Sequence, residues 1–282
     1  MGRNPFEVLK FRTHVLVAFI VSNLLVEIIY GILDYQRLLP WPLNDKLWIP
    51  VQFIIIFGLV CVVLITTGQR AGLQLTRLFG PPPRFPWAYG ILLISSMLIF
   101  SFSSFLLLFY PVSLFAPGFV EERLTEQLLN VETVAPGLYR YLMLFVVLVF
   151  APIAEEFVFR GVLLQRWAVR WNLPVGIIMS SLLFGMLHIN NPLGLTMFGV
   201  IMALLYIRTR SLWVPIIAHA LNNVVSVAPE LLSPGPQTFD IGDFQQTWWV
   251  GLIGLCLAAP TLWHFISNSW PHKNTQPPYF WE

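Results

Sequence analysis

Two adjacent glutamates, Glu155 and Glu156, occupy a hydrophobic segment of this 282-residue chain, where ionised side chains are costly. Arg160 follows Glu156 by four residues, so an α-helix places the two on one face and lets them pair. Glu155 is turned away by about 100° and lacks such a partner. A carboxylate paired with arginine and an unpaired one in an apolar segment are expected to have different pKa values, so the two acids can serve different roles. Glu155 is therefore a candidate general base, although an ion-pair network that only ties helices together would use the same residues.

Two later hydrophobic segments contribute histidines and an asparagine. One ends with Phe184 and, four residues on, His188; the other carries His219 and, four residues on, Asn223. Counted from the same side at about 1.5 Å per residue, Glu155 and His188 lie at depths of roughly 22 and 21 Å. His219 and Asn223 lie at depths of roughly 12 and 18 Å by the same count. The four polar side chains therefore overlap in depth, although each histidine alone also suits interhelical packing.

This set of side chains supports two chemistries. A base, proton carriers and hydrogen-bond donors for a developing oxyanion are what water-mediated amide hydrolysis requires. Glu155, His188 and His219 are also the ligand types of a zinc site, and the sequence does not separate the two. Asn222 competes with Asn223 for the donor role, but only the residue four positions on shares the face of His219.

The composition places this chemistry inside a membrane. Hydrophobic residues make up 57% of the chain and charged residues 11%, whereas about 25% of the residues in a soluble domain are charged. The net charge of +2 comes from scattered basic residues without a Lys/Arg block, so no nucleic-acid partner is expected. Cys61 and Cys256 lie apart in apolar runs and indicate no disulfide framework. We expect a multi-pass integral membrane protein in the lipid bilayer.

The apolar runs predict an all-α protein of about eight transmembrane helices around a buried polar catalytic cavity. The expected spans are 13 to 33, 47 to 67, 87 to 109, 139 to 168, 174 to 190, 194 to 208, 211 to 229 and 247 to 268. Most Lys and Arg residues fall in segments on the side of the N-terminus, which predicts that both termini are cytoplasmic. The loop 112 to 137 is expected to form an outer interfacial helix.

The three motifs together resemble a known signature. Glu155-Glu156-x-x-x-Arg160, Phe184-x-x-x-His188 and His219-x-x-x-Asn223 resemble the motifs of the CAAX protease and bacteriocin-processing enzyme family, which includes type II CAAX prenyl endopeptidases. The resemblance covers about residues 138 to 229. It implies an eight-helix membrane protease whose catalytic cavity opens toward the cytoplasm.

The resemblance also implies roles for the residues. Glu155 would activate a water that His188 helps to hold, and His219 and Asn223 would stabilise the oxyanion. Glu156, Arg160 and Phe184 would be structural or orienting residues. No cofactor is expected to be required, and the alternative is zinc held by Glu155, His188 and His219.

These inferences divide the chain and predict its function. We expect N-terminal helices and an interfacial segment in 1–137, a CAAX-protease-like core in 138–229, and an outer loop, last helix and tail in 230–282. The predicted function is hydrolysis of a peptide bond in a membrane-associated or prenylated peptide or protein. The alternatives are a non-catalytic membrane scaffold or bacteriocin-immunity protein, and a proton-coupled transporter, which also uses buried Glu and His.

Overall fold

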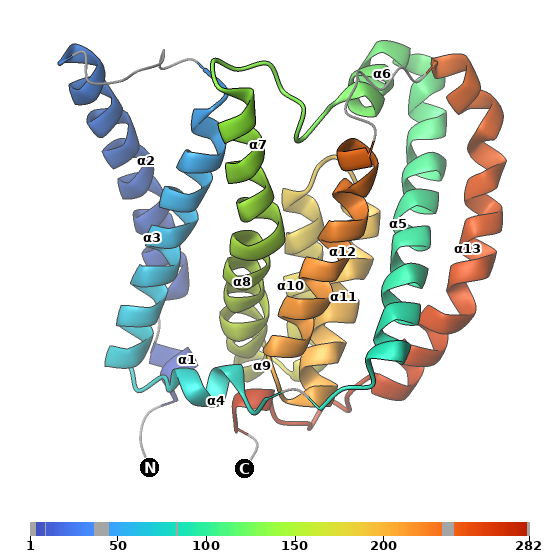
Figure 1. Cartoon of the computed structure of the whole chain (residues 1–282). Helices are drawn as coiled ribbons and strands as arrows, with labels where there is room; N and C mark the ends of the chain where they lie inside the picture. The colour runs from blue at the N-terminus through green and yellow to red at the C-terminus, as the bar shows by residue number, and fades with distance from the viewer. Residues whose placement is uncertain (1–3, 9, 37–44, 83, 233–239, 281–282) are drawn as a thin grey trace.

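A computed structural model describes residues 4–8, 10–36, 45–82, 84–232 and 240–280, and every regular element in these ranges is helical (Figure 1). The first half contains α1 (Pro5–Val8), α2 (Phe11–Tyr35), α3 (Trp48–Arg70), α4 (Leu75–Phe79), α5 (Trp87–Phe115) and α6 (Pro117–Thr125). A long composite helix follows, made of α7 (Pro136–Phe145), η1 (Val146–Phe150), α8 (Ala151–Glu156), η2 (Phe157–Leu164) and α9 (Gln165–Arg170). The last elements are α10 (Leu173–Leu187), α11 (Pro192–Thr209), α12 (Trp213–Leu232), α13 (Ile241–Ser269) and the short η3 (Pro278–Phe280). The all-α prediction is confirmed.

Among the described residues, six helices are long and apolar enough to cross a membrane. These spans are Thr13–Leu33, Trp48–Arg70, Trp87–Phe115, Pro136–Arg170, Pro192–Thr209 and Ile241–Ser269. The chain is therefore a polytopic membrane protein, while the count of eight stays a prediction. Two of the eight expected spans are not among the six. Helix α10 has 15 residues and ends at Leu187 rather than at residue 190, and α12 carries polar side chains that lower its hydropathy.

The helices differ in how much lipid-facing surface they keep. In α2, Leu16, Leu24 and Ile28 remain 56 to 59% exposed, as expected for side chains that face acyl chains. In α11, by contrast, Ile201, Met202 and Leu204 are fully buried. Figure 1 shows α2 and α3 at one side of the molecule, α5 and α13 at the other, and α11 between them. Helix α11 is thus central to the bundle that surrounds the polar residues.

Both ends of the chain lie at the same end of the bundle (Figure 1). The ring of Phe6 packs edge-on against Tyr279 at 5.1 Å, and the Tyr279 hydroxyl accepts a hydrogen bond from the Gln74 amide at 2.9 Å. The Arg166 guanidinium donates to the Phe6 carbonyl at 2.6 Å. The described ends of the chain therefore lie at one end of the bundle, while the cytoplasmic location of both termini stays a prediction.

The end of the bundle opposite the termini carries α6 and the segment that follows it. The helix expected between residues 112 and 137 is present as α6, which Figure 1 places at this end. The backbone amides of Leu128 and Leu129, which follow α6, donate to the Glu230 carboxylate at the end of α12. These bonds fix the segment after α6 over the bundle. Residues 233–239 of the expected outer loop lie outside the described residues.

Candidate active site

The glutamates lie in a short α-helical stretch between two π-helical stretches. Glu155 and Glu156 are the last residues of α8, and η1 and η2 flank it. Pro152, the second residue of α8, has no amide hydrogen and cannot make the backbone bond expected there. Wide turns of this kind recur at functional sites, because they change the direction in which side chains project. Glu155 is 7% exposed and Glu156 is fully buried, so only Glu155 keeps access to a small molecule.

Glu156 is tied to Arg160 as the sequence predicts. The guanidinium donates to Glu156 Oε1 at 2.7 Å, with both side chains essentially buried, and also donates to the Gly199 carbonyl at 3.1 Å. Gly199 also lets α11 pack closely against α10, since a Cβ there would lie 2.8 Å from the Ser181 Cα. The Arg160 guanidinium also lies 4.8 Å from the centre of the Phe184 ring. The cation is therefore compensated by a carboxylate, a carbonyl and an aromatic face.

Glu156 also holds His219, a contact that the sequence reasoning missed. His219 Nδ1 lies 2.9 Å from the same oxygen, Glu156 Oε1, and His219 is only 5% exposed. An Nδ1–H that donates to this carboxylate leaves Nε2 as the free ring nitrogen. His219 Nε2 lies 4.0 Å from Glu155 Oε2. This separation is too long for a direct hydrogen bond and is one that a bridging water or substrate oxygen can fill.

His188 is positioned by the end of α10. Its Nδ1 lies 2.7 Å from the Phe184 carbonyl, which leaves Nε2 free here as well. Gly185 brings α10 close to α11, because a Cβ at this position would collide with the Pro192 carbonyl and the Thr196 side chain. The Phe184 ring lies 4.5 Å from the His188 ring and 6.2 Å from the His219 ring, centre to centre. Both histidines thus border one aromatic side chain.

Asn223 lies one helical turn beyond His219, and its Nδ2 donates to the Val147 carbonyl at 2.8 Å. Its Oδ1 accepts a bond of 3.3 Å from the neighbouring Asn222 side chain. Asn223 therefore contacts the glutamate helix, whereas the side-chain amide of Asn222 contacts Asn223. The preference for Asn223 over Asn222 as the oxyanion donor stays a prediction.

The structure joins the helices that carry the three motifs through the contacts of Glu156 with His219, of Asn223 with Val147 and of Arg160 with Phe184. His219 Nε2 lies 4.0 Å from Glu155 Oε2, and His188 borders the same Phe184 ring as His219. The arrangement offers a nearly buried acid, two histidines with free Nε2 atoms and an amide donor, which suits proton transfer to and from a water. Within the described ranges, no three His, Cys, Asp or Glu side chains are grouped closely enough to hold a metal ion. The expectation of no required cofactor, with zinc held by Glu155, His188 and His219 as the alternative, stays a prediction.

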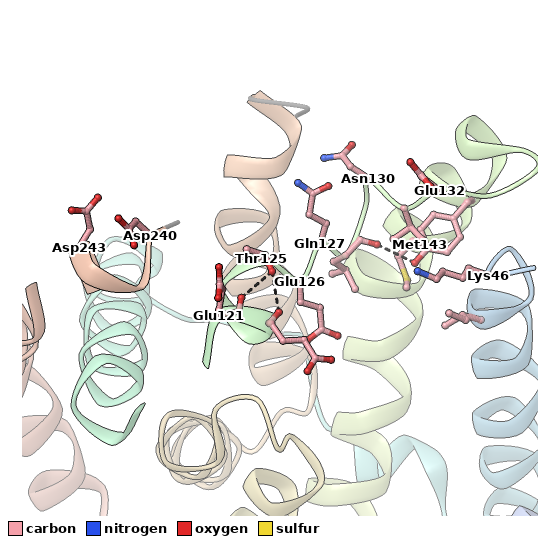
Figure 2. Close-up of a pocket in the computed structure, with 15 residues that line it drawn as sticks. Lys46, Glu121, Thr125, Glu126, Gln127, Asn130, Glu132, Met143, Asp240 and Asp243 are labelled. Carbon is pink, nitrogen blue, oxygen red and sulfur yellow. Dashed lines mark hydrogen bonds between the residues drawn. The ribbon is translucent and has the colours of Figure 1, made fainter. Parts of the chain in front are cut away.

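A large cavity lies at the end of the bundle opposite the termini. Its volume is about 1290 Å³, and it is lined by residues of α3, α6, α7 and the start of α13, together with the segments before α3 and after α6. Figure 2 shows Asp240 and Asp243 on one side of it and Lys46 and Glu132 on the other. Among the described residues, six carboxylates and one lysine line this outer cavity: Glu121, Glu122, Glu126, Glu132, Asp240, Asp243 and Lys46.

The outer cavity is linked to the histidine region. Asn190, two residues after His188, donates to Glu126 at 3.2 Å and accepts from Arg123 at 3.1 Å. The cavity thus lies beyond the end of α10 that carries His188, on the side away from both termini (Figure 1). If both termini are cytoplasmic, a site that opens through the outer cavity opens on the side away from the cytoplasm. For an opening through this cavity, the prediction of cytoplasmic termini therefore conflicts with the prediction of a catalytic cavity that opens toward the cytoplasm.

Comparison with known proteins identifies the central part of the chain. Residues 137–225 match the family described as type II CAAX prenyl endopeptidase Rce1-like. Over 113 residues the chain is 33% identical to the "Putative membrane peptidase YdiL" of Bacillus subtilis. This alignment covers 39% of this chain and 44% of that protein. Over 118 residues it is 35% identical to the "Membrane-embedded CAAX protease MroQ" of Staphylococcus aureus, covering 39% and 46%. No solved structure matches the chain significantly.

The matches confirm the resemblance to the CAAX protease family. They cover less than half of the length of either relative. The family match over residues 137–225 contains all three motifs that carried the resemblance, from Glu155 to Asn223.

Proposed function

We propose that this protein is a membrane endopeptidase that hydrolyses a peptide bond in a membrane-associated peptide or protein, with a C-terminal prenylated segment as the first substrate class to test. The observation that carries the proposal is the geometry of Glu155 and His219. Glu156 orients His219 so that its free Nε2 lies 4.0 Å from the Glu155 carboxylate. A carboxylate that orients a histidine beside the reacting centre is also the arrangement of hydrolytic triads.

In the proposed reaction, Glu155 takes a proton from a water molecule, and the water oxygen attacks the carbonyl carbon of the scissile amide. The C–N bond then breaks, and the proton passes to the leaving nitrogen, so the products are a carboxylic acid and an amine. His188 Nε2 can hold the attacking water. One Asn223 amide hydrogen can donate to the oxyanion, and His219 can do the same through Nε2 once that nitrogen has taken up a proton. Glu156 and Arg160 act by holding His219 and the helices in place.

The outer cavity is the proposed route by which the peptide reaches Glu155. It connects to the His188 end of α10 through the bonds of Asn190 to Glu126 and Arg123. An extended peptide entering through the outer cavity passes six carboxylates. A basic segment near the cleaved bond would complement this charge.

The proposal is tested by cleavage of synthetic peptides by the purified protein in liposomes. Matched peptides with and without a C-terminal prenyl group are compared, each with and without a metal chelator. The double variant Glu155→Ala/His219→Ala, prepared identically, serves as the blank for contaminating proteases. Cleavage above this blank that survives the chelator is the expected result. No cleavage of either peptide, or of a peptide library, by the full chain would instead favour the non-catalytic scaffold.

A further inference from the structure

The hydrogen-bond register of the composite helix is interrupted just before the two glutamates. The amide of Ala151 donates to the carbonyl of Val146, five residues back instead of the four of an α-helix. In this wider register, the next bond would join the amide of residue 152 to the Val147 carbonyl. Residue 152 is proline and has no amide hydrogen. The Val147 carbonyl is thus left without its backbone donor, and an unpaired carbonyl inside a membrane is costly.

The missing donor comes from a different helix. Asn223 Nδ2 of α12 lies 2.8 Å from the Val147 carbonyl oxygen, 76 positions away in the sequence. We infer that Asn223 is a positioning residue that braces the proline-interrupted helix beneath Glu155 and Glu156, by making the hydrogen bond that Pro152 cannot make. The role adds to a donor role in catalysis, because a side-chain amide has two hydrogens. In the described part of the chain, the second hydrogen has no protein acceptor.

The brace bears on the geometry of the site because α12 also carries His219. Helix α12 is joined to the glutamate helix at two points, His219 to Glu156 and Asn223 to Val147. His219 and Asn223 are one turn apart on the same face. Two hydrogen bonds one turn apart restrict both the rotation and the sliding of α12 against the glutamate helix, whereas a single bond would let α12 rotate about that contact. The 4.0 Å separation of His219 Nε2 from Glu155 Oε2 therefore depends on both bonds.

The test is a double-mutant cycle in which Pro152→Ala restores the missing amide. Asn223→Leu removes the brace while keeping a similar volume. In the wild-type background we expect Asn223→Leu to lower the Tm of the full-length protein in detergent by roughly 3 °C or more. In the Pro152→Ala background we expect less than a third of that loss, because the amide restored at position 152 can bond the Val147 carbonyl. An equal loss in both backgrounds would overturn the inference.

A matched control is available next to Asn223. The side-chain amide of Asn222 donates to Asn223 and makes no bond to the glutamate helix in the described residues. Asn222→Leu should therefore show no coupling to Pro152→Ala. If Pro152→Ala does not fold, hydrogen exchange of residues 146–156 in the two leucine variants decides the question. Faster exchange in Asn223→Leu alone supports the brace, and equal exchange in both contradicts it.

Kinetics separate bracing from a purely catalytic donor role, and this part rests on the proposed function. We expect Asn223→Leu to lower kcat per folded molecule with little change in KM, and Pro152→Ala to restore part of the loss. A donor that acts only on the oxyanion predicts no restoration, which would count against a positioning role. A wild-type protein that cleaves nothing would refute the proposed function, while the Tm cycle would still decide on the brace.

Discussion

Two arginine–glutamate pairs in this protein use the same chemistry in opposite surroundings. Arg160 donates to Glu156 at 2.7 Å in the bundle centre, and Arg123 donates to Glu126 at 3.2 Å beside the outer cavity. Each guanidinium also lies near a phenylalanine ring, at 4.8 Å from Phe184 for Arg160 and 5.2 Å from Phe119 for Arg123. The Arg160 and Glu156 side chains are 1% and 0% exposed, whereas those of Arg123 and Glu126 are 21% and 50% exposed.

The difference shows what burial does to an ion pair. At the outer end, water screens the charges, and each side chain can be solvated if its partner is lost. In the centre, neither charge can be solvated, so each depends on the other. Each central carboxylate can therefore have its own role, set by its fixed contacts. The carboxylates of the outer cavity instead attract cations through their combined negative potential.

The largest effect is expected when the central pair is broken. Arg160→Ala leaves Glu156 buried without its cation and should lower the free energy of unfolding by about 3–5 kcal/mol. The same change in the outer pair, Arg123→Ala, should cost about 0–1 kcal/mol. Both are measured as unfolding free energies of the purified protein in the same detergent. Similar losses for the two variants would show that burial does not separate the pairs.

A second variant separates the fold from the orientation of His219. The double substitution Glu156→Gln/Arg160→Met removes both central charges together, so the loss of stability should be much smaller than for Arg160→Ala alone. His219 nevertheless loses the carboxylate that orients its ring, and we expect kcat to fall by roughly 10²-fold. Peptide cleavage and thermal unfolding are measured on one preparation. Unchanged kcat would mean that Glu156 serves only the fold.

The sequence predicted the parts of this site that depend on local geometry. The Glu156–Arg160 bond follows from four-residue spacing on one helix, and the structure contains it. The bond from His219 to Glu156 was missed, because it depends on how α12 is rotated against a helix 63 positions away. Residue spacing carries no information on that rotation.

The backbone of the helix that carries the glutamates also differs from a continuous α-helix. Residues 139 to 168 were predicted as one helical span, and the structure widens this helix at η1 and η2. Pro152 was the available signal, but a proline predicts a kink or a bulge without saying which. The outer cavity was not predicted either, since its carboxylates come from segments as distant as Glu121 and Asp243.

The smallest effect is expected from the outer carboxylates. The double substitution Glu121→Gln/Glu122→Gln should raise KM for a peptide with basic residues near the cleaved bond by roughly 2–5-fold at low salt. The difference should disappear at about 0.5 M salt, because exposed charges are then screened within a few ångströms. Cleavage of a neutral peptide serves as the control. An equal effect on the neutral peptide would argue against an electrostatic role for the outer cavity.

The central claim, that Glu155 is the catalytic carboxylate, is tested most directly by kcat of Glu155→Gln in protein shown by thermal unfolding to be folded. Glutamine keeps the size of the side chain but cannot take a proton from water. The account predicts that kcat falls by about 10²–10⁴-fold with Tm close to that of the wild type, because Glu155 makes no ion pair with Arg160. A folded Glu155→Gln protein that cleaves peptide at the wild-type rate would contradict it.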